Sequence, residues 1–183
     1  MQILKLKEVL KKSEDILSES LNGNVQIKSH KKLSKELVTE IKSIDSKKFR
    51  KDLQYDESDL STRASLTGFY CLLVYLNDEL IAFDYGYEDS EDGVFFSDSA
   101  ATLIERKGIA RLLGLLELLY VFESGYKKIK FTTEEMDELG RPLREIWEKQ
   151  GYKTEKTYPD GNVDMVLEIN PSIVAERIKM NLR

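Results

Sequence analysis

The sequence predicts an α/β protein of α+β character, with a mixed central sheet of about seven strands flanked by helices. Two observations lead to this fold class. Stretches with apolar residues at every third or fourth position alternate with shorter stretches that have them at every second position, so helices and strands are both expected. In the second half of the chain a strand, a helix and a strand follow one another, which predicts a right-handed parallel crossover among otherwise antiparallel pairs.

Composition and charge narrow the functional classes. A chain of 183 residues is long enough for one domain with a good core, and its net charge of −5 argues against nonspecific nucleic-acid binding. The single cysteine, Cys71, cannot form an internal disulfide, which favours a reducing compartment. No stretch has the apolar length of a signal peptide core or a membrane span. We therefore expect a cytoplasmic protein without a membrane or nucleic-acid partner.

Residues 1–23 are expected to form an N-terminal helical extension. Apolar residues at helical spacing predict an amphipathic helix over residues 2–21 that packs on the domain, and Gly23 follows its end. Residues 24–29 alternate in the manner of a short strand. His30 has no second histidine or cysteine near it in the sequence, so no metal site is expected.

Two helices are predicted before the main run of strands. Ser34 is a favourable N-cap for a helix that runs to about Ile44. Residues 45–56 are mixed and charged, and they are expected to connect this helix to a second one over residues 57–66. The basic side chains of the connection are typical of a solvated face, with contact to a phosphate or an acidic substrate as the alternative.

An antiparallel meander of three strands is predicted next. Residues 69–76 and 80–87 form a hairpin, and residues 94–101 form the third strand. The turn over residues 87–93 is acidic. It is either simply solvated or attractive to an amine substrate.

A turn that favours anion binding leads into a buried helix. A helix that starts near Lys107 leaves its first backbone N–H groups without partners, and its positive dipole end favours a phosphate. Gly108 lets a ligand approach the backbone closely, and Arg106 adds positive charge. The helix from Arg111 to Glu123 is apolar nearly all round, so we expect it to be buried on more than one side. An ordinary strand-to-helix junction is the alternative for the turn.

The last third of the chain predicts two more helices and three strands. A strand over residues 127–132 precedes a helix over residues 140–150, and a hairpin joins residues 153–158 and 162–169. Residues 171–183 predict a C-terminal helix. The apolar side chains of the helix before the hairpin are expected to face inward; they are Leu143, Ile146 and Trp147.

The anion-binding turn resembles the acetyl-CoA pyrophosphate loop of the GNAT superfamily of N-acetyltransferases, which reads Gln/Arg-x-x-Gly-x-Gly/Ala. Glu105, Gly108 and Ala110 occupy its three defined positions. The two small residues match, whereas Glu105 departs from the family preference. The predicted order of elements over residues 24–170 also matches the GNAT fold, which leaves residues 1–23 and 171–183 as additional helices.

A second motif supports this resemblance. The last core helix of the family carries Asn-x-x-Ala-x-x-Leu-Tyr-x-x-x-Gly-Phe, and the final four defined places are filled here by Ile146, Trp147, Gly151 and Tyr152. Gly140 stands where the family has Asn. Two partial motifs in the expected order are stronger together than either is alone.

The resemblance implies that the protein binds acetyl-CoA as a co-substrate, without a metal, and transfers its acetyl group to a primary amine of a small molecule or a protein. In such a site the pantetheine pairs with the strand before the loop, and the pyrophosphate lies on the loop and the helix start. The residues expected to bind the cofactor are Ser99, Ala100, Ala101, Arg106, Lys107, Gly108, Ile109, Ala110 and, beside the pantetheine, Trp147.

Asp98 is the first candidate for the base that deprotonates the amine. By two-residue alternation it shares a face with Phe96 and Ala100, and a carboxylate among apolar neighbours is expected to have a raised pKa. Asp84 on the neighbouring strand is the second candidate. A purely structural role is the alternative for each.

The acid that protonates the leaving thiolate is less obvious. Trp147 occupies the position of the family's tyrosine, and an indole N–H is not a useful acid. Tyr152 or Tyr120 could substitute, with core packing as the alternative, and a thiolate can also leave without an acid. Together with Glu105 and Gly140, Trp147 keeps open a second hypothesis: a catalytically inactive GNAT-fold protein that binds acyl-CoA or regulates.

Overall fold

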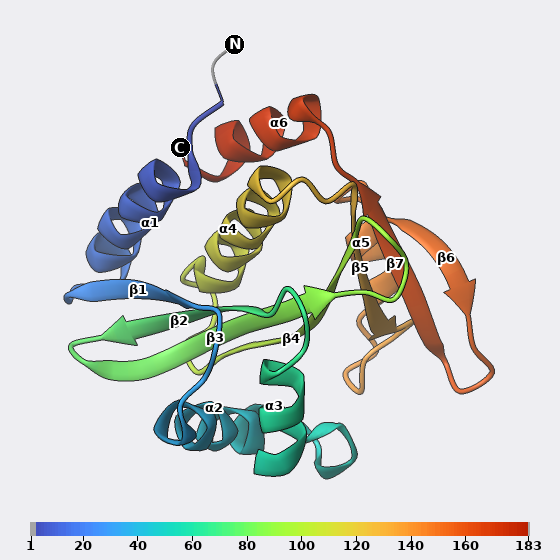
Figure 1. The fold of residues 1–183 in the computed structure, drawn as a ribbon, viewed down its shortest axis with the longest axis horizontal. Coiled ribbons are helices and arrows are strands. Elements are labelled where there is room, and N and C mark those ends of the chain that lie inside the picture. Colours follow the sequence, from blue (N-terminus) through green and yellow to red (C-terminus); the bar gives the residue numbers. More distant parts are fainter. Residues whose placement is uncertain (1–2, 183) are drawn as a thin grey trace.

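The computed structural model describes residues 3–182, and Figure 1 labels its helices and strands. The predicted helix start at Gln2 and the last residue, Arg183, lie outside the described residues. The helices are α1 Leu6–Leu21, α2 Lys35–Lys48, α3 Glu57–Ala64, α4 Ile109–Glu123, α5 Leu143–Glu148 and α6 Pro171–Asn181, with a 3-10 turn at Lys51–Leu53. The strands are β1 Val25–His30, β2 Tyr70–Leu76, β3 Glu79–Glu88, β4 Val94–Thr102, β5 Lys128–Glu134, β6 Lys153–Thr157 and β7 Asn162–Glu168.

The seven strands form one mixed sheet in the order β1-β2-β3-β4-β5-β7-β6. All neighbouring strands are antiparallel except β4 and β5, which are parallel and are connected through α4. The predicted fold class, the mixed sheet and its single crossover are therefore confirmed.

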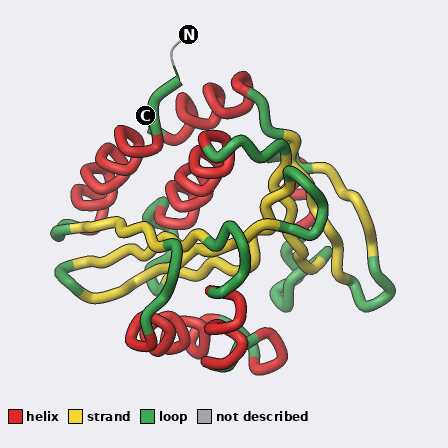
Figure 2. Tube along the Cα trace, in the orientation of Figure 1, coloured by secondary structure: helices red, strands yellow, loops and turns green. Residues whose placement is uncertain are grey.

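Helices cover both faces of the sheet, with α1, α4 and α6 on one face and α2 and α3 on the other (Figures 1 and 2). The strand β2 is buried on both faces, so its apolar side chains alternate between two cores. Leu72 and Val74 pack in the core beneath α1, α4 and α6. Cys71 and Leu73 pack in the core beneath α2 and α3.

The helix α4 is buried between the sheet, α1 and α6. Its sequence has apolar residues on every side, and most of its side chains are inaccessible to solvent, as predicted. Within residues 3–182, none of the helices combines the length and the apolarity that crossing a membrane requires.

Helix α2 is one turn longer than predicted and reaches Lys48 rather than Ile44. Asp45 continues the buried face, because its carboxylate is 1% exposed and accepts a hydrogen bond of 3.0 Å from Lys42. Lys47 and Lys48 in the last turn complement the negative end of the helix dipole. The extension brings Lys48 close to the end of β4.

Helix α5 is shorter than the predicted residues 140–150. Gly140 has a φ of +74°, which is incompatible with a helical residue. Asp137 holds the preceding loop by accepting hydrogen bonds from the backbone N–H groups of Leu139 and Arg141. The inward orientation predicted for Ile146 is wrong, because its side chain is 40% exposed on this short helix.

Candidate functional site

The sheet divides at its parallel pair. The strands β4 and β5 are paired only along Val94–Phe96 and Lys128–Lys130. Beyond this point β4 continues to Thr102 beside β3, and β5 continues to Glu134 beside β7. Residues 97–102 of β4 therefore present their outer backbone edge to the opening between the two strands.

A β-bulge lies where the two strands separate. Tyr85 of β3 is opposite Ser99, but the next residue, Gly86, is opposite Ser97, so Asp98 is an extra residue in β4. A bulge bends its strand and changes the direction of the side chains. It also interrupts the alternation, so Asp98 does not share a face with Ala100 as predicted, because Ala100 pairs with Asp84 on the α4 side.

The Asp98 carboxylate lies on the α3 side of the sheet and is 5% exposed. It accepts hydrogen bonds from Arg63 Nε at 2.7 Å, from the Tyr87 hydroxyl at 3.0 Å and from the Tyr55 hydroxyl at 3.1 Å. The Arg63 guanidinium also lies over the Tyr55 ring at 3.7 Å. The predicted apolar neighbourhood of Asp98 is thus wrong, and the carboxylate ties α3 to the sheet.

Two further buried carboxylates lie on the opposite face of the sheet. Asp84 of β3 is 4% exposed and Glu117 of α4 is 6% exposed. Among the described residues, Asp84 Oδ1 and Glu117 Oε1 have no hydrogen-bond partner. Burial raises the pKa of both groups, and the Asp84 charge raises that of Glu117 further. The sequence marked Glu117 only as a charged residue of an apolar helix, because its partner is distant in the chain.

Trp147 of α5 and Tyr152, which lies between α5 and β6, form an aromatic cluster with Phe131 of β5. Their rings contact Phe131 edge to face, at centroid distances of 4.8 and 5.0 Å, and contact each other at 5.5 Å. Burial raises the pKa of Tyr152, and the charge of nearby Glu117 adds to this effect. Tyr120 lies elsewhere, stacked on Tyr70 at 3.6 Å, which fits core packing.

The loop before α4 has the geometry of an anion site. Arg106 has a φ of +60° and Gly108 a φ of +84°, and α4 begins at Ile109 with Gly108 as its N-cap. The first backbone N–H groups of α4, from Ile109 onward, have no intrahelical acceptor. The guanidinium of Arg111 lies beside Gly108, since a Cβ built on residue 108 would be 3.6 Å from it. These donors and charges favour a phosphate group.

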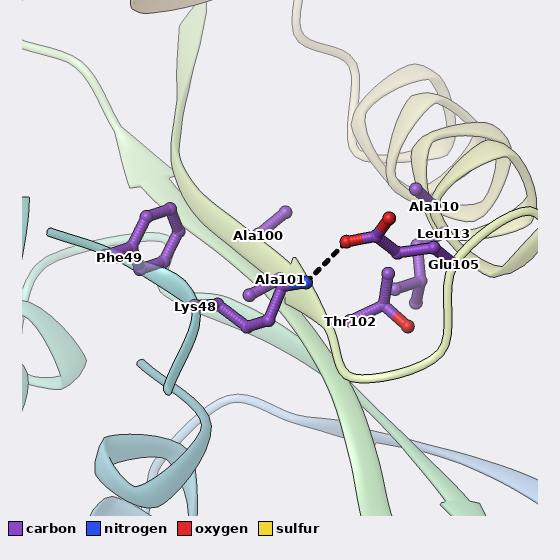
Figure 3. Close-up of a pocket in the computed structure, with 8 residues that line it drawn as sticks. All are labelled: Lys48, Phe49, Ala100, Ala101, Thr102, Glu105, Ala110 and Leu113. Atoms are coloured by element: carbon purple, nitrogen blue, oxygen red, sulfur yellow. Dashed lines mark hydrogen bonds and ion pairs between the residues drawn. The ribbon is translucent and has the colours of Figure 1, made fainter. Parts of the chain in front are cut away.

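A pocket of about 210 Å³ lies between this loop, α4 and the end of β4 (Figure 3). Its lining is mostly apolar and includes Ala100 and Ala101 of β4 and Ala110 of α4, all predicted to contact the cofactor. Lys48 and Glu105 face each other across it. Trp147 is not part of the lining. No cluster of three metal-ligating side chains occurs within the described part of the chain.

The sequence matches no protein-family model and no curated protein. Solved structures with the same fold include N-acetyltransferases. The ribosomal-protein-S18-alanine N-acetyltransferase of Escherichia coli aligns with a TM-score of 0.63 and 14% identity over 80% of this chain and 94% of its own. The PaiA N-acetyltransferase of Thermoplasma acidophilum, in complex with coenzyme A, aligns with a TM-score of 0.61 and 14% identity over 79% and 99%.

An aminoglycoside 6'-N-acetyltransferase complexed with coenzyme A aligns with a TM-score of 0.67 and 15% identity over 79% of this chain and 97% of its own. Other similar structures are described as acetyltransferases of the GNAT family. The chain therefore has the GNAT acetyltransferase fold.

Proposed function

We propose that the protein is an N-acetyltransferase that transfers an acetyl group from acetyl-CoA to a primary amine of a small molecule or a protein. The observation that carries the proposal is the coincidence of three features at one place. The sheet opens between β4 and β5, and the opening ends at the N-terminus of α4. An apolar pocket lies there, between the end of β4 and α4. Two solved structures with this fold are coenzyme A complexes.

The proposed cofactor site uses the residues expected from the sequence. The pantetheine amides pair with the free edge of β4 at Ser99, Ala100 and Ala101. The pyrophosphate accepts hydrogen bonds from the loop and from the start of α4, and the side chains of Arg106 and Lys107 supply positive charge. The residues assigned to the pyrophosphate are Arg106, Lys107, Gly108, Ile109 and Ala110.

The proposed reaction is direct attack of the amine nitrogen on the thioester carbonyl. In this proposal, backbone N–H groups of β4 near the bulge at Asp98 stabilise the negative charge that develops on the carbonyl oxygen. The attacking amine gives up a proton, and the sulfur of the leaving thiol receives one. Tyr152 is our candidate donor for that second proton, because a phenol hydroxyl is protonated at neutral pH, whereas the indole of neighbouring Trp147 offers no acidic proton.

Two carboxylates remain candidates for the base, and their surroundings favour Asp84. Asp98 already accepts three hydrogen bonds, one of them from a guanidinium, so accepting a proton there would break an ion pair. Asp84 has an oxygen without a partner and a raised pKa, both of which suit a group that takes up a proton near neutral pH. Because Asp84 is buried, we propose that it acts through water.

Calorimetric titration with acetyl-CoA tests cofactor binding directly. A screen of pooled primary amines for release of free CoA thiol then tests transfer. Binding together with thiol release in the presence of one amine pool supports the enzyme. The absence of acetyl-CoA binding by a folded protein would contradict the proposal.

A catalytically inactive acyl-CoA-binding or regulatory protein is the second candidate. The observation that favours it is Trp147, whose indole replaces the usual hydroxyl and is packed against Phe131 and Tyr152. Acetyl-CoA binding without release of thiol for any amine pool would select this candidate.

A further inference from the structure

An ion pair lies in the lining of the pocket. Lys48, the last residue of α2, places its Nζ 2.6 Å from Oε1 of Glu105, in the loop between β4 and α4. Figure 3 shows both side chains extending toward each other past the end of β4. Both residues line the pocket. The pair therefore lies in the wall of the pocket, beside the loop that leads to the start of α4.

The carboxylate of Glu105 has the same sign of charge as the phosphate that the start of α4 favours, so it competes with that ligand and repels it. It lies three residues before the N-cap Gly108, beside a helix end that favours negative ligands. Its side chain is 69% exposed, whereas that of Lys48 is 28% exposed. The hydrogen bond from Lys48 holds the pKa of Glu105 below its usual range, so the carboxylate is charged at neutral pH.

We propose that Lys48 binds a phosphate of the acyl-CoA substrate. In the absence of that ligand, the Glu105 carboxylate pairs with Lys48, and the phosphate displaces the carboxylate on binding. The proposal rests on the acetyl-CoA site described above and assigns two residues within it. A solvent-exposed ion pair contributes little to stability, so it exchanges easily for another anion. A pyrophosphate group carries more negative charge than one carboxylate and receives additional hydrogen bonds from the loop. It therefore competes effectively for Lys48.

The first test removes the competing charge. Glu105→Gln keeps the size of the side chain, frees Lys48 and removes repulsion of the phosphates, so we expect acetyl-CoA affinity to rise about threefold to tenfold in low salt. S-acetylpantetheine, which has no phosphate, should bind the variant and the wild type equally. Equal acetyl-CoA affinity of both proteins would overturn the role of Glu105.

The second test separates direct binding by Lys48 from mere neutralisation of Glu105. Lys48→Met keeps the aliphatic stem, and we combine it with Glu105→Gln. If Lys48 contacts the phosphate, the double variant binds acetyl-CoA about fivefold or more weakly than Glu105→Gln alone. If the double variant and Glu105→Gln bind acetyl-CoA equally, Lys48 only neutralises Glu105 and does not contact the phosphate, so the proposal is wrong. Lys47→Met, an exposed neighbour on the same helix turn, is the matched control and should leave affinity unchanged.

These outcomes are distinguishable from failure of the proposed function. If neither the wild type nor any variant binds acetyl-CoA while all remain folded by circular dichroism, both the site and this proposal fail. If all bind with the same affinity, the acetyl-CoA site stands and only the assignment of Lys48 and Glu105 fails.

Discussion

Asp84 and Glu117 place two carboxyl groups near each other in the protein core, one on β3 and one on α4. Both side chains are less than a tenth exposed, and neither forms an ion pair within residues 3–182. Two neighbouring buried carboxylates without a cation cannot both be charged at low cost. The pair is therefore expected to hold at least one proton at neutral pH.

This carboxylate pair predicts an unusual dependence of stability on pH. Burial raises the folded-state pKa of both groups above their unfolded values, which are near 4. Their protonated forms stabilise the fold fully below about pH 4, and this contribution is lost as the pH rises through the folded-state pKa values. A difference of one pKa unit corresponds to about 1.4 kcal/mol. Asp84→Asn should thus raise the melting temperature relative to wild type more at pH 8 than at pH 5.

Melting curves by circular dichroism between pH 5 and pH 8 measure this difference. Glu79→Gln, an exposed carboxylate on the same strand, is the control and should give a difference that does not change with pH. Parallel profiles for wild type and Asp84→Asn would mean that Asp84 is charged in the folded protein.

The ion pair between Asp98 and Arg63 predicts a loss of stability when either partner is removed. Asp98→Asn keeps the shape of the side chain but leaves the largely buried guanidinium without its charge partner, so we expect the free energy of unfolding to fall by about 2–3 kcal/mol. Arg63→Gln should have a similar effect, and the double variant should lose less than the sum. Urea denaturation of the three variants measures these values.

Activity of the same Asp98→Asn variant tests the alternative role. If turnover falls ~10²-fold while the free energy of unfolding and acetyl-CoA affinity are unchanged, Asp98 is the base and its three hydrogen bonds are secondary. Nearly normal turnover in a destabilised protein leaves Asp84 as the candidate. Tyr87→Phe, which removes only one of the hydrogen bonds, is the milder control.

A substitution at Gly108 tests whether the pyrophosphate binds at the start of α4. Gly108→Glu introduces bulk and negative charge at the start of α4, so we expect acetyl-CoA binding to fall below detection by calorimetry. The variant also suffers backbone strain of roughly 1–2 kcal/mol, because Gly108 has a φ of +84°. Gly114→Glu makes the same chemical change further along α4, where a Cβ meets open space, and it should bind normally. Undiminished binding by a folded Gly108→Glu protein would place the cofactor elsewhere.

The aromatic cluster predicts different effects for its two candidate residues. Trp147→Phe retains an apolar ring against Phe131 and should lower stability by about 1 kcal/mol with little change in turnover. Tyr152→Phe removes the proposed proton donor, so its turnover should be lower at every pH and the alkaline limb of the pH–rate profile should be altered. Loss of turnover in Trp147→Phe, with binding and folding intact, would instead assign a direct role to the indole N–H.

Much of the fold follows from local patterns. The alternation of residues 70–88, the apolar helix α4 and the strand that follows it predict the meander and the crossover, because these features depend on periodicity over short stretches. The limits of the short helix α5 do not follow from such local patterns, because they are set by the loop that Asp137 holds. The GNAT resemblance located the loop at Gly108 correctly at the start of a helix.

The candidate site is less predictable, because its contacts join distant parts of the chain. Alternation in β4 placed Asp98 with Ala100, but the bulge depends on the register against β3, which the sequence of β4 does not encode. Arg63 reaches Asp98 from a helix 35 residues earlier, and Lys48 reaches Glu105 across 57 residues. Such partners become visible only when the sheet and its helices are assembled.

The separation of β4 from β5 gives this protein an exposed strand edge in the middle of its sheet rather than at its border. Residues 97–102 present backbone amides on the side where β5 has already diverged. An extended chain with regularly spaced amides can add to such an edge as a strand would. Any ligand that does so stabilises the protein by RT ln(1 + [L]/Kd), which increases with the ligand concentration relative to Kd. Short extended peptides could therefore act as competitors of the cofactor, without resembling a nucleotide at all.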